Sequence, residues 1–233
     1  MKATAIILAA GIGKRMKSNC PKQYLALGGM PILTRTLTAF DDHPEVSAIV
    51  LVAADKDMSF ISSSVLAETA WKTNIILTAG GLRRQDSVLE GLKAARALTD
   101  DDDIVLVHDG VRPFVDRGLI TACIVGAAET GACIPAVPAS DTLKQVDGRD
   151  MVASTVSRET IRLVQTPQVF LFKLLREGFE QVVKQNLSVT DDAGVIEAMG
   201  LPVKIVPGNP MNIKITTPQD LTIAEALLGI GLP

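Results

Sequence analysis

Short apolar runs alternate with amphipathic segments along most of the chain, which is the pattern of a parallel sheet covered by helices. The apolar runs predict buried strands at residues 5–10, 48–53, 74–79, 103–109, 132–137 and 203–206. Apolar residues at helical spacing predict helices at 31–40, 56–70, 117–129 and 171–184, and further helices that begin after Gly81, near Thr190 and at Pro218. The sequence therefore predicts the α/β class, with a mostly parallel sheet and helices on both of its faces.

The pattern changes between residues 138 and 169, where no helix separates the predicted strands. Short alternating runs at residues 142–146 and 161–164 lie on either side of a hairpin signal, Asp147-Gly148. A stretch of this size buries little apolar surface by itself, because it has no helix to pack on. We expect a β-arm that protrudes from a single domain, residues 1–233, and packs against another molecule, most simply a second copy of the chain.

Composition excludes several classes of protein. The 233-residue chain has a formal net charge of -3, which argues against a nucleic-acid partner or a membrane-surface partner. No apolar run reaches the roughly 18 residues that a membrane span needs. Cys20, Cys123 and Cys133 are odd in number and lack C-x-x-C spacing, so neither a disulfide framework nor a zinc site is predicted. These features fit the reducing environment of the cytoplasm.

The loop after the first predicted strand carries the strongest chemical signal. Its small residues leave backbone amides open to a nucleotide phosphate, and they are Ala9, Ala10, Gly11 and Gly13. Arg15 and Lys22 add positive charge, and Pro21 stiffens the segment from which Lys22 projects. We interpret the loop as a cradle for a triphosphate. The alternative is a glycine turn followed by a solvated basic loop.

The spacing within this loop excludes two common phosphate-binding motifs. The Walker A pattern, G-x-x-x-x-G-K-[ST], does not occur in the sequence. A dinucleotide fingerprint needs a third small residue and then an acid about 20 residues later. Met16 stands at the position of that small residue, and Asp55 comes too late to be that acid. Another kind of phosphate site is therefore expected.

A second glycine pair, Gly80 and Gly81, follows the strand predicted at residues 74–79 and precedes a helix. A backbone without side chains lets a base or a ribose lie close to it. Asp86 or Ser87 is suited to cap the helix that follows.

Asp109 ends the strand predicted at residues 103–109. Ligands of open α/β sheets bind outside the carboxyl ends of the strands, which is where Asp109 lies. Its carboxylate is a candidate ligand for the Mg²⁺ that accompanies a triphosphate, since Mg²⁺ favours one or two carboxylates together with phosphate oxygens and water. The alternative is that Asp109 caps the following turn and bonds to Arg112. We interpret His108 as structural, because neighbouring side chains on a strand point to opposite faces.

Four strings match the pattern of one enzyme family: L-A-A-G-x-G-x-R-M at residues 8–16, P-K-Q-Y at 21–24, H-D-x-x-R-P at 108–113 and N-I-K-x-T at 212–216. Together they resemble the signature of the 2-C-methyl-D-erythritol 4-phosphate cytidylyltransferases. The resemblance implies a Rossmann-like nucleotidyltransferase domain that uses CTP and a polyol phosphate. It also implies a homodimer in which the arm completes the active site of the partner.

The resemblance implies roles for individual residues as well. Arg15, Lys22 and Lys214 would be the catalytic cations, although Lys214 could also be a solvated strand lysine. Gly81 and Ser87 would contact the nucleoside. The residues that would bind the acceptor are Thr142, Arg158, Thr190 and Arg112, and Thr190 is equally suited to be a helix N-cap.

Two other functions stay open at this point. A ribitol-5-phosphate cytidylyltransferase would share the H-D-x-x-R-P and P-K-Q strings, while the L-A-A-G string favours methylerythritol phosphate as the acceptor. A catalytically silent nucleotide-binding regulator could keep the cradle. The presence of Arg15, Lys22, Asp109 and Lys214 together argues against that regulator, because a mere binder could lose some of them.

Overall fold

The computed structural model describes residues 2–11, 13–16, 20–67 and 69–231, and in that part of the chain no helix has the length and apolar character needed to cross a membrane. The α-helices are α1 (Ile32–Asp41), α2 (Met58–Ile61), α3 (Arg84–Ala95), α4 (Arg117–Thr130), α5 (Phe172–Lys184), α6 (Ala193–Ala198) and α7 (Pro218–Gly229). The strands are β1 (Ala3–Ala9), β2 (Ala26–Leu27), β3 (Met30–Pro31), β4 (Val46–Ala53), β5 (Asn74–Ala79), β6 (Ile104–Asp109), β7 (Ala132–Pro138), β8 (Leu143–Val146), β9 (Val152–Val156), β10 (Arg162–Val164), β11 (Gln168–Leu171) and β12 (Lys204–Pro207). Short 3₁₀ turns are η1 (Lys14–Met16), η2 (Lys22–Tyr24), η3 (Asp55–Asp57) and η5 (Arg158–Thr160), and η4 (Ser62–Leu66) is a π-helical turn.

The central sheet has the order β10-β7-β11-β6-β1-β4-β5, and β12 pairs with β7. The strands β5, β4, β1 and β6 run parallel, whereas β10 and β11 run antiparallel to their neighbours. From β1 the chain passes to β4 and β5 on one side, and it then returns to place β6 on the other side of β1. This reversal is a topological switch point, and the carboxyl ends of β1 and β6 face it.

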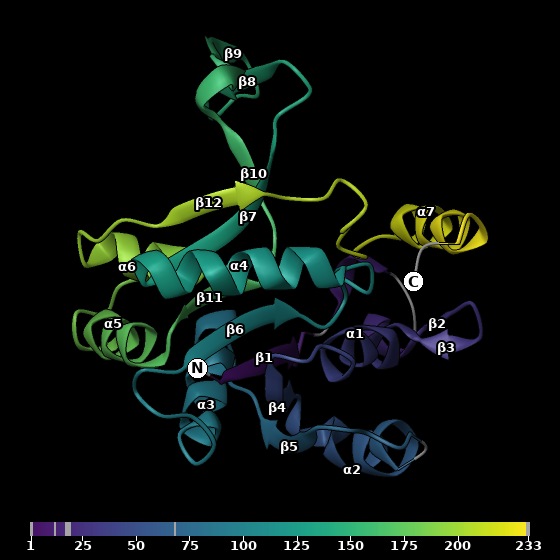
Figure 1. Ribbon diagram of the computed structural model, residues 1–233. Coiled ribbons are helices and arrows are strands. Elements are labelled where there is room, and N and C mark those ends of the chain that lie inside the picture. The colour runs from purple at the N-terminus through teal and green to yellow at the C-terminus, as the bar shows by residue number, and fades with distance from the viewer. Residues whose placement is uncertain (1, 12, 17–19, 68, 232–233) are drawn as a thin grey trace.

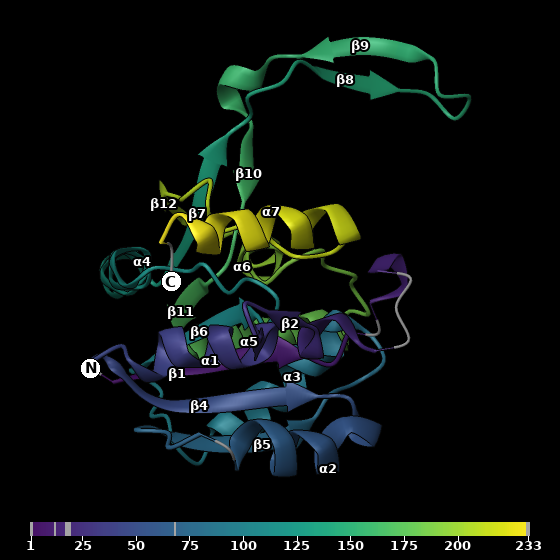
Figure 2. The ribbon, with the colours of Figure 1, turned by 90° about the vertical axis from the view of Figure 1, so that its right-hand side faces the viewer.

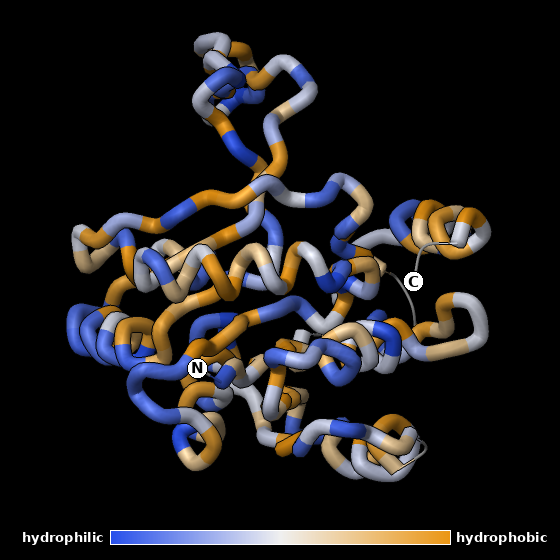
Figure 3. Tube along the Cα trace, in the orientation of Figure 1, coloured by the Kyte–Doolittle hydropathy of each residue, from blue (hydrophilic) through white to orange (hydrophobic). Residues whose placement is uncertain are grey.

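Helices cover both faces of the sheet (Figure 1), as the sequence predicts. On one face α1, α2 and α4 bury side chains such as Phe40 and Ile120, and on the other α3, α5 and α6 pack around Phe170 and Phe179. The close approach of α3 depends on Gly91, where a Cβ atom would lie 2.5 Å from Cγ2 of Ile6. In Figure 3 hydrophobic colouring follows much of the central strands, and hydrophilic residues gather on α5 at the lower left. The mixed α/β fold is therefore confirmed.

The segment predicted as a helix over residues 56–70 is less regular than expected. It is divided into η3, α2 and η4, and residue 68 lies outside the described residues. The hydroxyl of Ser63 donates to the backbone oxygens of Ser59 and Phe60 at 3.0 and 3.4 Å. Three consecutive serines begin η4, and serine has a lower helix propensity than alanine or leucine, in agreement with the irregular helix.

The prediction that Thr190 caps the next helix is wrong, because α6 begins at Ala193. Asp191 supplies the capping oxygen, and its Oδ1 accepts from the N–H of Gly194 at 3.1 Å. The side-chain oxygen of Gln168 accepts from the N–H groups of Asp192 and Ala193, both at 2.9 Å. A glutamine on β11 therefore caps this helix from a distance that sequence spacing does not reveal.

The predicted arm is present, but it is shorter than residues 138–169. The hairpin of β8 and β9 pairs only with itself, whereas β10 and β11 belong to the central sheet. Figure 2 shows the hairpin extending well away from the body, on the side toward which the carboxyl end of β4 points. Val146, Met151 and Val152 on this hairpin are each more than half exposed. The arm thus carries apolar side chains that its own chain leaves uncovered.

Candidate active site at the switch point

A cleft lies at the switch point, where β1 and β6 end side by side with Leu8 opposite Asp109. Its volume is about 230 Å³. Its walls come from the loop after β1, the loop between β5 and α3, the end of β6 and the segment before α7. The lining residues are Leu8, Ala9, Ala10, Gly11, Lys22, Gln23, Gly81, Leu82, Arg83, Arg84, Ser87, Asp109, Val111 and Lys214.

The residues of the P-K-Q-Y string, which follow the loop after β1, hold that loop against the body of the protein. The buried amide of Gln23 donates to the carbonyl oxygen of Ala9 at 2.8 Å, which ties η2 to the end of β1. The Tyr24 hydroxyl bonds to Asp57 at 3.2 Å, and its ring packs edge-on against Phe60 with centroids 5.0 Å apart. Two anchored residues follow Lys22, so its side chain projects into the cleft from a fixed backbone.

Gly13 has a structural reason to be glycine. Its φ of 67° lies in the left-handed region, which disfavours a side chain. A Cβ there would also lie 3.1 Å from Cγ of Lys22, so the glycine makes room for the lysine stem. Met16, which excluded a dinucleotide fingerprint, is buried in the hydrophobic cluster of Leu27 and Ile32 and anchors η1.

The loop between β5 and α3 is packed too closely for side chains at its glycines. A Cβ on Gly81 would lie 2.4 Å from Cβ of Asp86. The hydroxyl of Ser87 accepts from the Gly81 N–H at 3.2 Å, and the carboxylate of Asp86 accepts from the Arg83 N–H at 3.1 Å. The capping interpretation is therefore confirmed for Asp86. Ser87 fixes the glycine loop and also lines the cleft.

Asp109 is the buried carboxylate at the base of the cleft. Its Oδ2 lies 2.9 Å from Nζ of Lys214 and 3.4 Å from Nε of Arg112. Burial by itself would raise the pKa of Asp109, but Lys214, Arg84 and Arg112 together hold that pKa well below its usual range. Asp109 is therefore ionised at neutral pH, and it bonds to Arg112 while it also faces the cleft.

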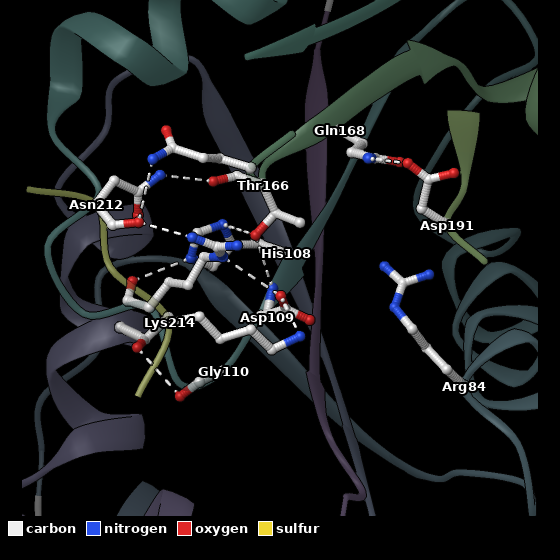
Figure 4. Close-up of polar contacts among 12 residues, drawn as sticks. Arg84, His108, Asp109, Gly110, Thr166, Gln168, Asp191, Asn212 and Lys214 are labelled. Atoms are coloured by element: carbon white, nitrogen blue, oxygen red, sulfur yellow. Dashed lines mark hydrogen bonds and ion pairs between the residues drawn. The ribbon is translucent and has the colours of Figure 1, made fainter. Parts of the chain in front are cut away.

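A chain of hydrogen bonds fixes the turn that carries Asp109 (Figure 4). Nε2 of His108 lies 3.1 Å from the carbonyl oxygen of Arg112, so Nε2 must carry the hydrogen. Nδ1 then accepts from the Thr166 hydroxyl at 3.0 Å, and the same hydroxyl accepts from the Asp109 N–H at 3.2 Å. Burial lowers the pKa of His108 to about 4, in agreement with a neutral ring. His108 is structural, as the alternation along β6 predicts.

Lys22 and Lys214 converge on this carboxylate from different elements. Burial, followed by repulsion from Lys214, lowers the pKa of Lys22, and Asp109 opposes that shift. The segment of Lys214 is fixed by the Ile215 N–H, which donates to the carbonyl oxygen of Val111 at 2.9 Å. Among its described lining residues, the cleft thus combines the ammonium groups of Lys22 and Lys214 and the carboxylate of Asp109 with a bend of small residues after β1. This arrangement suits a polyanion.

The structure brings most of the predicted nucleotide-site residues together. Ala9, Ala10, Gly11, Lys22, Gly81, Ser87, Asp109 and Lys214 all line the cleft. Gly13 and Arg15 lie beside it, and the exposed Arg15 acts on Lys22 through its charge. Arg112 lies behind Asp109, where its guanidinium donates to the carbonyl oxygen of Asn212 at 2.7 Å.

The other predicted acceptor residues do not line the cleft of their own chain. Thr142 and Arg158 are exposed near the base of the arm, and the Arg158 guanidinium donates to the carbonyl oxygen of Ser140. Thr190 is exposed in the segment before α6. Their assignment to the acceptor stays a prediction.

Sequence reasoning missed three residues that build the cleft. Gln23 belongs to the P-K-Q-Y string, and Arg84 stands three residues after the second glycine pair, so both lay within or beside stretches that the sequence analysis singled out. Thr166 had no signal, because only the pairing of β11 with β6 brings it to Asp109.

Comparisons with known proteins show which family the chain belongs to. The sequence model of the 2-C-methyl-D-erythritol 4-phosphate cytidylyltransferase family matches residues 3–230. The chain belongs to this family. Over 229 residues it is 43% identical to the 2-C-methyl-D-erythritol 4-phosphate cytidylyltransferase of Syntrophus aciditrophicus, covering 97% of this chain and 96% of that one. It is 42% identical over 233 residues to the enzyme of that name from Geobacter metallireducens, covering 100% of both.

Solved structures of family members have the same fold. The 4-diphosphocytidyl-2C-methyl-D-erythritol synthase of Anaerococcus prevotii superposes with a TM-score of 0.84 at 35% identity, covering 98% of this chain and 96% of that one. The 2-C-methyl-D-erythritol 4-phosphate cytidylyltransferase of Thermus thermophilus gives 0.79 at 37% identity, covering 98% and 100%. Family membership also places the chain among the nucleotidyltransferases.

The buried His108 makes stability depend on pH. Its pKa is about 4 in the folded chain and near 6.5 when unfolded, so between these values the unfolded state binds more protons. Lowering the pH from 7.5 to 5 should therefore cost about 2 kcal/mol of unfolding free energy through this ring. Urea titrations give the unfolding free energy at both pH values. The loss of unfolding free energy between pH 7.5 and pH 5 should be smaller in His108→Gln than in the wild type, by about 2 kcal/mol. An unchanged pH dependence in that variant would contradict the assignment.

Proposed function

We propose that the protein transfers the cytidylyl group of CTP to 2-C-methyl-D-erythritol 4-phosphate, giving 4-diphosphocytidyl-2-C-methyl-D-erythritol and pyrophosphate, a step of non-mevalonate isoprenoid synthesis. The observation that carries the proposal is the cleft itself, in which Lys22 and Lys214 face an amide-lined bend beside Asp109. The family assignment and the relatives' names support CTP and the acceptor. Ribitol 5-phosphate is the alternative acceptor.

The chemistry needs charge neutralisation more than proton transfer. An oxygen of the acceptor phosphate forms a bond to the α-phosphorus of CTP, while the bond from that phosphorus to the pyrophosphate oxygen breaks. The acceptor phosphate has a second pKa near 6, so it is mostly ionised already and requires no general base. His108 is buried with both ring nitrogens engaged, which suits a structural role. Arg15, Lys22 and Lys214 are the proposed catalytic cations.

The residues present fit Mg²⁺ as the proposed cofactor. Asp109 is ionised, and the ion pairs that it forms with Lys214 and Arg112 both fall on Oδ2. Among the described residues there is no cluster of three or more His, Cys, Asp or Glu side chains, which agrees with a Mg²⁺ held by one carboxylate together with phosphate oxygens and water. When bound, the ion would offset negative charge on the triphosphate. The cytoplasmic location stays a prediction.

A homodimer is proposed from the arm. A two-stranded hairpin is at best marginally stable alone, yet this one extends from the body with its apolar residues exposed. A second copy of the chain would cover them. It would also bring Thr142 and Arg158 of one subunit to the cleft of the other, where they would bind the acceptor phosphate, with Thr190 near its hydroxyls.

One assay tests the reaction directly. Pyrophosphate release is measured with each of the four common nucleoside triphosphates, combined with methylerythritol phosphate or ribitol phosphate. We expect release with CTP and methylerythritol phosphate to exceed every other combination. Greater release with ribitol phosphate would favour the alternative acceptor, and no release with any pair would favour a silent regulator.

Removing a proposed catalytic cation tests the cleft. Lys22→Ala and Arg15→Ala should each lower kcat by on the order of 10²-fold or more, because each removes charge that offsets the developing pyrophosphate. Circular dichroism should show an unchanged fold. Lys184→Ala, on the exposed end of α5, is the control and should retain activity. A near-normal kcat in Lys22→Ala would remove the catalytic assignment.

Subunit mixing tests the shared site. Arg158→Ala and Lys22→Ala subunits are each expected to be inactive alone, but a mixed dimer holds one intact cleft facing one intact arm. Random mixing should restore about a quarter of wild-type activity, since half of the dimers are mixed and each has one intact site of two. Lys22→Ala mixed with Arg15→Ala is the control, because both changes lie in the cleft and neither site is intact. Equal activity in the two mixtures would contradict the shared arm.

A further inference from the structure

A partly buried ion pair, between Arg84 and Asp192, lies on the wall of the cleft opposite Lys214. Arg84 lines the cleft as the first residue of α3, and its guanidinium donates to both oxygens of Asp192, at 2.9 and 2.6 Å. The Asp192 side chain is completely buried. Two parallel bonds of this kind fix the guanidinium in one orientation.

Stability alone does not explain this pair. Buried ion pairs lose hydration that their attraction only partly restores, and apolar residues of similar size are often as stable. A cation at the first position of a helix is also unfavourable, because the helix dipole is positive there. The loss of hydration falls mainly on Asp192 and the unfavourable helix position on Arg84, and this suggests that the position of the Arg84 charge matters to the cleft.

Arg84 and Lys214 act on Asp109 from different elements (Figure 4). After Lys214, Arg84 is the cation with the largest influence on Asp109. Among the described residues, however, Asp109 forms its ion pairs within 4.0 Å with Lys214 and Arg112, and not with Arg84. Arg84 is therefore attracted to Asp109 across the cleft and is held away from it.

Asp192 is itself held firmly in place. Its N–H donates to the side-chain oxygen of Gln168 at 2.9 Å, and the amide nitrogen of Gln168 donates to Asp191 at 2.8 Å. We infer that Asp192 is a positioning residue that tethers Arg84, so that the guanidinium lends its charge to the cleft without pairing with Asp109. One side of the Asp109 carboxylate then stays open for the ligands of the reaction. This role rests on the function proposed above for Asp109.

This inference predicts an unusual pattern of activities among variants of Arg84 and Asp192. Asp192→Asn keeps the shape of the side chain but frees Arg84 to pair with Asp109, so kcat/KM should fall by at least tenfold. Arg84→Met combined with Asp192→Leu removes both charges and should recover activity to several times that of Asp192→Asn. Asp101→Asn is the matched control, because Asp101 also accepts from an arginine, Arg96, but lies on the surface. It should leave activity unchanged.

A structural readout separates the tether from the proposed reaction. A crystal structure of Asp192→Asn should place the Arg84 guanidinium within 4 Å of Asp109, whatever reaction the protein catalyses. A guanidinium that stays away from Asp109 in that structure overturns the tether, as does a double variant no more active than Asp192→Asn. If Asp192→Asn does not fold, Arg84→Lys replaces it, since lysine keeps the charge but loses the two parallel bonds. The ammonium should then contact Asp109, and finding it only on Asp192 likewise overturns the inference.

Discussion

The rest of the cleft depends on the attraction between the buried, ionised carboxylate of Asp109 and the cations around it. An isolated charge at this depth would be neutralised, because burial favours the protonated acid. Lys214, Arg84 and Arg112 keep it charged, and each comes from a different part of the chain. The carboxylate therefore draws the segment before α7, the start of α3 and the turn after β6 to one place. Its charge also offsets part of the positive charge of the two lysines when no polyanion is bound.

The backbone around Asp109 is arranged to hold it without using the carboxylate oxygens that face the cleft. Thr166 binds its N–H, and His108 connects Thr166 to the carbonyl oxygen of Arg112. A neutral imidazole with fixed donor and acceptor nitrogens is well suited to this position, since one nitrogen meets a carbonyl and the other a hydroxyl. A protonated ring would donate from both nitrogens, so Nδ1 could no longer accept a hydrogen bond. The low pKa of His108 therefore keeps the ring in the form that these hydrogen bonds require.

The sequence predicted the parts of the site that local patterns determine. The strands β1 and β6, with the loops that follow them, could be found from apolar runs that end in glycine or aspartate, and the P-K-Q-Y string marked Lys22. The arrangement behind the cleft could not be predicted in this way. Gln168 caps α6 from β11, and Arg84 pairs with Asp192 across 108 positions of sequence, so neither contact leaves a periodic signal. The predictions of a cap at Thr190 and of a regular helix over residues 56–70 were wrong. Asp191 and Gln168 cap α6 instead, and a run of three serines begins the π-helical turn η4.

The base of the arm is directly connected to the residues behind the cleft, although the hairpin itself extends away from the body. The arm leaves the sheet through β7 and returns through β10, which pairs antiparallel with β7. The residues that follow β10 are those that hold the cleft: Gln165 donates to the backbone of Asn209, Thr166 bonds to the Asp109 N–H, and Gln168 fixes Asp192. A force that displaced β10 would therefore act first on the residues behind the cleft. The antiparallel pairing of β10 with β7 therefore fixes both the base of the arm and the start of the segment behind the cleft.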